Sequence, residues 1–245
     1  MVDTMVVGQV VGVEALAALG AVDFLMWVVT GISTGLTQGF SIQLSQYYGA
    51  KDFENLRKSL AHSYRLTAFI AAGVLILSQS FASLVLTGLH TPSNIIGMSL
   101  LYLRIIFCGI PATAAYNMFA SALRAMGNSK TPLTAMIIAS VLNVSLDILF
   151  VAGFGWGVAG AAIATVIAQS FSAVYCFLIL RRIDIVHLTR ADFMPASGMN
   201  ARLMKLGIPV VFQNIIIGVG GLVVQYVING YGFLFVAGFT ATNKL

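Results

Sequence analysis

Long apolar segments dominate the chain, and charged residues interrupt them only at intervals. Four stretches contain no Asp, Glu, Lys or Arg: 24–50, 66–103, 148–180 and 206–243. A helix that crosses the hydrocarbon core of a bilayer needs about 20 mostly apolar residues, and Gly, Pro and polar clusters divide the longer stretches. The pattern therefore predicts spanning helices at about 19–46, 60–87, 98–122, 132–152, 158–180 and 206–230.

The segments are apolar on every face, whereas a helix of a soluble bundle shows a polar face with a period of 3.6 residues. Composition agrees, since 59% of the 245 residues are hydrophobic and 9% are charged, against roughly 25% charged residues in soluble domains. This excludes an ordinary soluble enzyme and a disordered chain. The net charge of +5 does not indicate a nucleic-acid partner, because the basic residues form no patch. The predicted fold class is all-α transmembrane.

Basic residues alternate between the predicted connections. The first, third, fifth and seventh connections (12–18, 88–97, 153–157 and 230–235) contain no Lys or Arg. The second, fourth and sixth (47–59, 123–131 and 181–205) contain Lys51, Arg57, Lys58, Arg124, Lys130, Arg181, Arg182, Arg190, Arg202 and Lys205. Because basic connections stay in the cytoplasm, we expect a multi-pass plasma-membrane protein whose N-terminus lies on the cytoplasmic side.

Both ends of the sequence are hydrophobic segments too short to cross a bilayer. Residues 1–11 form a stub without the basic region or cleavage site of a signal peptide. A further span starts near Val236 and stops at Leu245. We therefore expect the chain to be a fragment of a larger membrane protein, with the first helix truncated.

Two carboxylates lie within the apolar segments, where ionisable groups are costly and indicate function. Asp147 precedes the turn at 153–157 by six residues and Asp3 precedes Gly12 by nine. At 1.5 Å per residue, they lie about 9 and about 13 Å below the outer ends of their helices. A pair of carboxylates at similar depth can share a proton or bind Na⁺. The alternatives are an Asp147 that snorkels outward or pairs with an arginine, and a solvated Asp3.

Asn143 and Thr165 are candidate partners of this pair. Asn143 lies four residues before Asp147, on the same helical face, and an amide oxygen suits a hard cation. Thr165 follows the 153–157 turn by about eight residues, at comparable depth. Ordinary interhelical hydrogen bonding explains Asn143 and Thr165 equally well. The sequence shows no catalytic group, and the two cysteines and three histidines follow no metal-binding spacing.

Other residues within the spans suggest packing, bending and a substrate cavity. Gly31, Gly35 and Gly39 recur every four residues, which predicts close approach of another helix. Pro111 and Pro209 interrupt spans, and each is either a hinge or a static kink. Neutral polar side chains within the spans are candidates for lining a cavity that accepts an amphiphile: Gln38, Asn117, Gln169 and Gln213.

Five motifs, taken together, resemble the multidrug and toxic compound extrusion (MATE) transporters, DinF-like branch. They read VDTMVVGQVVGVEALAALG, GLTQGFSIQLSQYYGAKD, SALRAMGNSKTP, NVSLDILFVAGFGWGVAGAAIATVIAQ and GIPVVFQN. The resemblance covers nearly the whole chain. It implies a twelve-span fold of two six-helix lobes. This chain would then hold the first lobe, with a partial first helix, in residues 1–183 and a cytoplasmic inter-lobe linker in residues 184–205. Residues 206–245 would form the first helix of the second lobe and the beginning of the next helix.

The resemblance also implies an activity: export of organic cations or amphiphilic drugs in exchange for Na⁺ or H⁺, by alternating access and without a cofactor. The family's ion-site residues match Asp3, Asn143, Asp147 and Thr165, and a tyrosine of the fourth helix matches Tyr102 less securely. NorM-like members carry an acidic residue in the seventh helix, and residues 207–230 contain none. We therefore expect coupling in the first lobe.

Three alternatives to drug export are weighed. A flippase for lipid-linked oligosaccharides, from the same superfamily, would need basic residues in a central cavity, but here they lie at the span edges. An intramembrane aspartyl protease would need a motif such as GxGD, which is missing from the sequence. The chain alone is also compatible with an inactive membrane fragment. The expected partners are small organic cations or amphiphiles, the bilayer and a missing second lobe.

Overall fold

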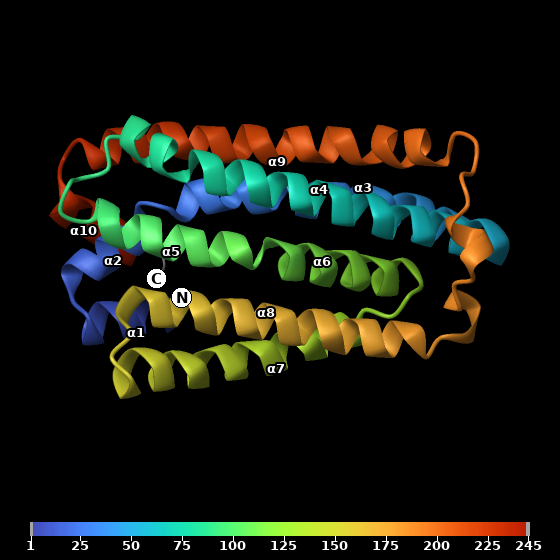
Figure 1. Ribbon diagram of the computed structural model, residues 1–245, viewed down its shortest axis with the longest axis horizontal. Helices are drawn as coiled ribbons and strands as arrows, with labels where there is room; N and C mark the ends of the chain where they lie inside the picture. Colours follow the sequence, from blue (N-terminus) through green and yellow to red (C-terminus); the bar gives the residue numbers. More distant parts are fainter. Residues whose placement is uncertain (1, 244–245) are drawn as a thin grey trace.

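The computed structural model describes residues 2–243, apart from the side chains of Val2, Asp3 and Met5. Every regular element in this part of the chain is helical. Figure 1 shows the long helices side by side, nearly parallel to the long axis of the molecule. The predicted all-α transmembrane fold is confirmed.

The helices coincide with the predicted spans. The first span is α2 (Val13–Gly20) followed by α3 (Asp23–Gly49), and the second is α4 (Phe53–Gly88). The third is divided into α5 (Ile96–Cys108) and α6 (Ile110–Ala125). The remaining spans are α7 (Lys130–Asp147) with the π-helix η1 (Ile148–Gly153), α8 (Gly157–Arg181) and α9 (Met199–Asn229). Two short helices, α1 (Val2–Val10) and α10 (Phe233–Asn243), are the first and last in chain order. Within 2–243, five helical segments are long and apolar enough to cross a membrane, and the α5–α6 pair makes a sixth.

The predicted first connection, 12–18, was wrong in extent. It is helical from Val13 onward, and Gly12 alone makes the sharp turn, with a positive φ of 118° that favours glycine. The sixth connection is also shorter than predicted, because α9 already begins at Met199.

The two prolines behave differently. Pro111 lies in the first turn of α6, just after a bend of 47° between α5 and α6. A proline is tolerated there because the first amides of a helix have no intrahelical acceptor. Pro209 lies inside α9, which continues through it. Whether Pro209 acts as a hinge or as a static kink within this continuous helix stays a prediction.

The connections gather at two ends of the molecule. In Figure 1 the α3–α4, α6–α7 and α8–α9 connections lie at the right, and the α1–α2, α4–α5, α7–α8 and α9–α10 connections lie at the left. The first group and the helix ends beside it contain ten of the 13 Lys and Arg residues, those of the predicted second, fourth and sixth connections, so we call it the basic end. The alternation read from the sequence thus corresponds to two physical ends of one helical bundle.

Glycines bring α3 and α9 into direct backbone contact. An added Cβ on Gly35 would lie 2.8 Å from the backbone of Val211, and one on Gly39 would lie 2.6 Å from Gly207 N. Asn214 Nδ2 donates a hydrogen bond of 3.1 Å to Gly31 O. Glycines of α9 also leave space for side chains of α3, because Val28 packs against Gly218 and Phe24 packs against Gly221. The predicted close approach at Gly31, Gly35 and Gly39 is confirmed, with α9 as the antiparallel partner.

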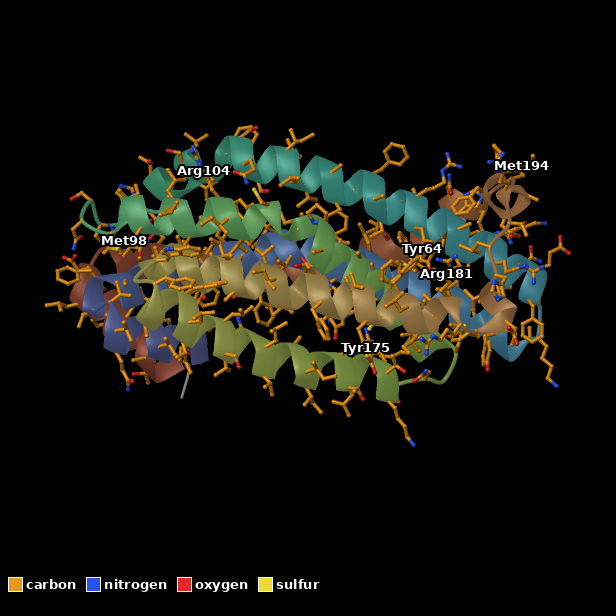
Figure 2. All side chains as sticks on the ribbon, turned by 60° about the horizontal axis from the view of Figure 1, so that its bottom comes forward. Tyr64, Met98, Arg104, Tyr175, Arg181 and Met194 are labelled. Atoms are coloured by element: carbon orange, nitrogen blue, oxygen red, sulfur yellow. The ribbon has the colours of Figure 1, made fainter. Side chains whose placement is uncertain are left out.

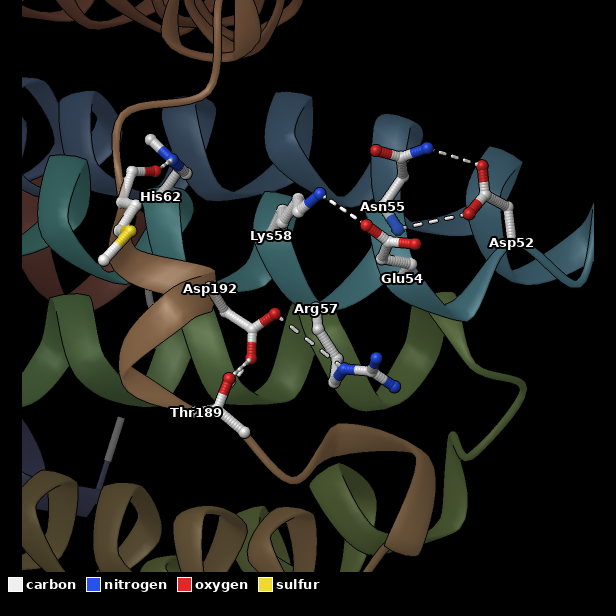
Figure 3. A network of polar contacts seen from close by, with 9 residues as sticks. Asp52, Glu54, Asn55, Arg57, Lys58, His62, Thr189 and Asp192 are labelled. Atoms are coloured by element: carbon white, nitrogen blue, oxygen red, sulfur yellow. Dashed lines mark hydrogen bonds and ion pairs between the residues drawn. The ribbon is translucent and has the colours of Figure 1, made fainter.

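The segment between α8 and α9 is tied to the start of α4 by polar contacts. It contains two short 3-10 helices, η2 (Asp184–Val186) and η3 (Arg190–Phe193). Arg57 Nε lies 3.9 Å from Asp192 Oδ1 (Figure 3). The buried His62 contacts Asn200 Oδ1 at 2.7 Å and Met194 O at 3.1 Å. Burial would raise the pKa of the Asp192 carboxyl, but hydrogen bonds from Thr189 and the charge of Arg57 hold that pKa below its usual range. The basic end is therefore ordered by its own side chains.

Many large apolar side chains remain on the outside of the bundle. Phe69, Ile76, Val141 and Ile216 are each more than 60% exposed. Apolar surface of this extent marks a contact with lipid or with another protein. Together with the apolar helix lengths, it indicates a bundle embedded in a membrane.

Candidate functional site

A cavity of about 240 Å³ lies between α6, α7 and α8. Small or polar side chains make most of its wall: Tyr116, Met136, Ala139, Ser140, Asn143, Thr165, Ala168, Gln169 and Ser172. It therefore brings together three residues selected from the sequence, which are Asn143, Thr165 and Gln169. The cavity exists because the alanine and serine side chains are small, and the amide and hydroxyl groups make its wall polar.

Asn143 and Thr165 contact each other across the α7–α8 interface. Asn143 Nδ2 donates to Thr165 Oγ1 at 3.4 Å, a long hydrogen bond. The Thr165 hydroxyl donates in turn to Ala161 O at 3.0 Å, one turn earlier on α8. The two side chains that the depth argument placed together are thus neighbours.

Asp147 is the last residue of α7 and is fully buried, with 0% of its surface exposed. It lies one helical turn from Asn143 on the same helix. The π-helix η1 follows it directly, and π-helical turns inside α-helices occur often at functional sites. The alternative of an Asp147 that snorkels to the surface is excluded by this burial.

Asp3 is carried by α1, and its side chain lies outside the described residues. The helix itself packs against α7, η1 and α8. Val7, one turn after Asp3, is fully buried in one apolar cluster with Val151 of η1 and Ala161 of α8. The element that carries Asp3 is thus adjacent to the elements that carry Asp147 and Thr165. The pairing of Asp3 with Asp147 stays a prediction.

Tyr102 is buried on α5, with 6% of its surface exposed, and belongs to the same apolar cluster as Val7 and Val151. Because α5 packs against α8, Tyr102 lies on the α1 and α8 side of the bundle. A role for its hydroxyl in ion coupling stays a prediction.

The predicted substrate-cavity residues are dispersed. Gln169 lines the cavity, whereas Asn117 Nδ2 donates to Thr34 Oγ1 at 3.1 Å and so links α6 to α3. Gln38 and Gln213 are exposed on α3 and α9 and do not line this cavity. Of the four predicted substrate-cavity residues, Gln169 is therefore the one that lines the same cavity as Asn143 and Thr165.

Sequence reasoning missed Tyr116, Ser140 and Ser172, which complete the cavity wall. A usable signal was present on α8. Small or polar residues recur there at helical spacing, at 165, 168, 169 and 172. This stripe is distinct from the apolar remainder of α8 and marks the face toward the cavity.

The donor set suits a small cation or a proton. A carboxylate, an amide oxygen and a hydroxyl are ligands of hard cations, and a buried carboxylate has a lower cost of burial when it binds H⁺ or a metal cation. The wall of the cavity itself is neutral, because neither Lys, Arg nor a carboxylate lines it. Asp147 lies outside that wall, one helical turn from Asn143.

Curated bacterial proteins resemble the chain. The “Probable multidrug resistance protein YpnP” of Bacillus subtilis (strain 168) is 31% identical over 244 residues, covering 100% of this chain and 55% of that protein. The “Multidrug export protein MepA” of Staphylococcus aureus (strain NCTC 8325 / PS 47) is 24% identical over 221 residues, covering 89% of this chain and 49% of that protein. The chain thus spans about half the length of these relatives.

Solved structures share the fold. An inward-facing multidrug resistance MATE family transporter of the MOP superfamily superimposes with a TM-score of 0.92 at 23% identity, covering 99% of this chain and 56% of that chain. The MATE multidrug transporter DinF-BH gives a TM-score of 0.88 at 23% identity, covering 98% of this chain and 55% of that chain.

The family model named MatE matches residues 1–149, which is more than half of the chain. The match extends from α1 to the start of η1 and so includes Asn143 and Asp147. The resemblance drawn from the five motifs is confirmed: the chain belongs to the MatE family.

Proposed function

We propose that the chain is part of a secondary active efflux transporter that exports organic cations or amphiphilic drugs in exchange for Na⁺ or H⁺. The observation that carries this proposal is the complete burial of Asp147 one turn from Asn143, beside a polar cavity that Thr165 also lines. A carboxylate inside an apolar bundle is stabilised only when it is neutralised. Reversible neutralisation is the property that an ion-coupled transporter needs.

The proposed mechanism is alternating access. Binding of H⁺ or Na⁺ at Asp147, with Asp3, Asn143, Thr165 and Tyr102 as proposed partners, changes the relative stability of inward- and outward-facing states. One elementary charge that moves through 100 mV supplies about 2.3 kcal/mol, equivalent to roughly a 50-fold concentration ratio. The bend between α5 and α6 beside Pro111 is the proposed hinge.

The division of the chain follows from the same proposal. Residues 1–183 form the first lobe, 184–205 the cytoplasmic linker, and 206–245 the start of the second lobe. The basic end then faces the cytoplasm, in accordance with the positive-inside rule. The remaining partner is a second lobe, since relatives are about twice as long as this chain.

The flippase alternative is less well supported. A lipid-linked diphosphate would require basic residues in the central cavity. The wall of the α6–α7–α8 cavity contains no Lys or Arg, and its neutral polar lining favours a cation or a proton.

The experiment replaces Asp147 with Asn in the complete gene product, reconstituted in proteoliposomes. Efflux of a fluorescent organic cation is measured under imposed Na⁺ or H⁺ gradients. Asp147→Asn should abolish gradient-driven export while membrane insertion is retained. Ser145→Ala is the matched control, because Ser145 is exposed on the same helix and donates only to Val141 O. Full export by Asp147→Asn would overturn the proposal.

A second measurement tests the alternative of an inactive fragment. The genomic DNA on both sides of the coding sequence is determined, and the 245-residue chain is assayed beside the complete gene product. The proposal predicts in-frame sequence for the rest of the first helix and for a second lobe. A gene that encodes only these residues and supports no export would leave the chain as an inactive fragment.

A further inference from the structure

A second groove runs along the outer face of α4, α6 and α8, apart from the cavity that holds Asn143. It consists of two adjoining cavities that share Tyr64 and Phe177. The first, of about 250 Å³, lies at the basic end and includes Arg181 and His187. The second, of about 380 Å³, extends into the bundle between α4 and α6. Figure 2 shows Tyr64 and Arg181 close together toward the basic end.

The end of the groove near the basic end is cationic. Arg181 is the last residue of α8 and is exposed. Among the described residues, no carboxylate lies within ion-pair distance of the Arg181 guanidinium. Asp184, three residues further along the chain, contacts His187 at 3.7 Å. A guanidinium presents paired donors that match the geometry of a phosphate group.

Two hydroxyl groups follow along α4. Tyr64 packs edge-on against Phe119, with ring centroids 5.5 Å apart, and Phe119 packs on Phe177, so that aromatic rings form the junction of the two cavities. Thr67 lies three residues after Tyr64, on the same helical face. It is 8% exposed and lines the groove, but its Oγ1 is itself buried from the groove. The hydroxyl that a ligand in the groove can reach is therefore that of Tyr64, which lines both cavities.

The rest of the groove is apolar and narrow. Small side chains form its floor: Ala68, Ala71, Ala72, Ala114 and Ala115, with Leu75, Pro111 and Met118 beside them. From Tyr64 to Leu75 the groove extends about 16 Å along α4. The groove thus changes from cation to hydroxyl to hydrocarbon with increasing depth.

We propose that this groove binds one anionic phospholipid of the leaflet at the basic end. Its phosphate lies against Arg181, an ester oxygen accepts a hydrogen bond from the Tyr64 hydroxyl, and an acyl chain lies between α4 and α6. The polarity of a phospholipid follows the same order as the groove, and the positive charge of Arg181 complements an anionic headgroup. An organic cation, by contrast, would be repelled at that end. The site does not depend on the proposed transport function.

The experiment uses the complete gene product in phosphatidylcholine nanodiscs with a trace of phosphatidylglycerol that carries a photoreactive acyl chain. Peptides that contain Ala68–Leu75 and Pro111–Phe119 should carry the cross-links. Arg181→Gln should lower the preference for phosphatidylglycerol over an identical phosphatidylcholine probe about fivefold, as expected for one arginine near the surface. Arg182→Gln, the adjacent exposed arginine, which does not line the groove, should leave that preference unchanged.

A second pair of variants tests the acyl-chain part. Ala72→Phe fills the groove and should remove the cross-links, whereas Ile76→Phe, at a 65% exposed position outside it, should retain them. Circular dichroism and gel filtration verify that each variant is folded. Any of four results would overturn the proposal. The first two are an equal loss of preference in Arg181→Gln and Arg182→Gln and equal labelling by both lipid probes. The others are displacement of the lipid by excess inorganic phosphate and equal labelling by a cationic amphiphile.

Discussion

Two helix interfaces in this bundle use small residues with opposite results. Between α3 and α9, each contact glycine faces either the backbone or a side chain of the opposite helix, so the helices touch closely from Gly207 to Gly221 of α9. Between α7 and α8, alanines and serines face Asn143, Thr165 and Gln169, and a cavity remains. The difference shows that small residues close an interface when backbone or side chains of the opposite helix fill the space that they leave.

The polar groups of the two interfaces differ accordingly. Asn214 of α9 is confined between Gly31 and Gly35 and donates to a backbone carbonyl. Asn143 of α7 meets only the Thr165 hydroxyl, through a longer contact of 3.4 Å. A polar group at the closed interface therefore stabilises packing, whereas Asn143 at the open interface lines a cavity.

The largest effect is expected at Gly39. In Gly39→Ala the added Cβ would meet the Gly207 backbone, and backbone cannot rotate away, so the variant should lose about 1–3 kcal/mol of stability. Gly73→Ala is the control, because its Cβ would meet nothing within 4 Å. Unfolding in mixed detergent micelles measures both. Equal stabilities would show that the α3–α9 contact is loose.

A smaller loss is expected when the interhelical hydrogen bond of Asn214 is removed. Asn214→Ala should destabilise the protein by about 0.6–2 kcal/mol, the range for such bonds in membranes. Gln213→Ala, on the exposed neighbouring residue, should change little. If both variants unfold alike, the bond to Gly31 O does not contribute to the closed interface.

The smallest effect is expected on the open side. Ser140 lines the cavity and is exposed, so Ser140→Leu should fill free space and shift stability by no more than about 0.5 kcal/mol. The same unfolding assay applies. A loss as large as that of Gly39→Ala would mean that the α7–α8 interface is as closed as the α3–α9 interface.

The spans were predictable because the hydrocarbon core imposes a length on apolar helices. The predicted 132–152 and 158–180 each differ by a few residues from the Lys130–Gly153 and Gly157–Arg181 helices. Local backbone choices were not predictable. The α5–α6 bend, the π-helix after Asp147 and the intact helix at Pro209 depend on which neighbours pack against each backbone, and hydropathy does not contain that information.

Residues of the candidate site were predictable where their polarity and depth within an apolar helix set them apart. Asn143, Asp147 and Thr165 were selected in this way, because few polar side chains lie at that depth. Gln38 and Gln213 share that property but face elsewhere, since a residue's direction depends on the rotation of its helix. Tyr116 and Ser140 were missed because neither stands out by charge or depth.

The antiparallel contact of α3 with α9 has a consequence for how the molecule can be divided. The proposed boundary between the two lobes falls between residues 183 and 206, yet α9, which follows it, packs closely on α3 from Gly207 to Gly221. In its contacts α9 therefore belongs with the preceding helices. A recombinant polypeptide that ends at the proposed boundary would expose the glycines of α3 to lipid, so the unit suited to separate production ends after Asn229.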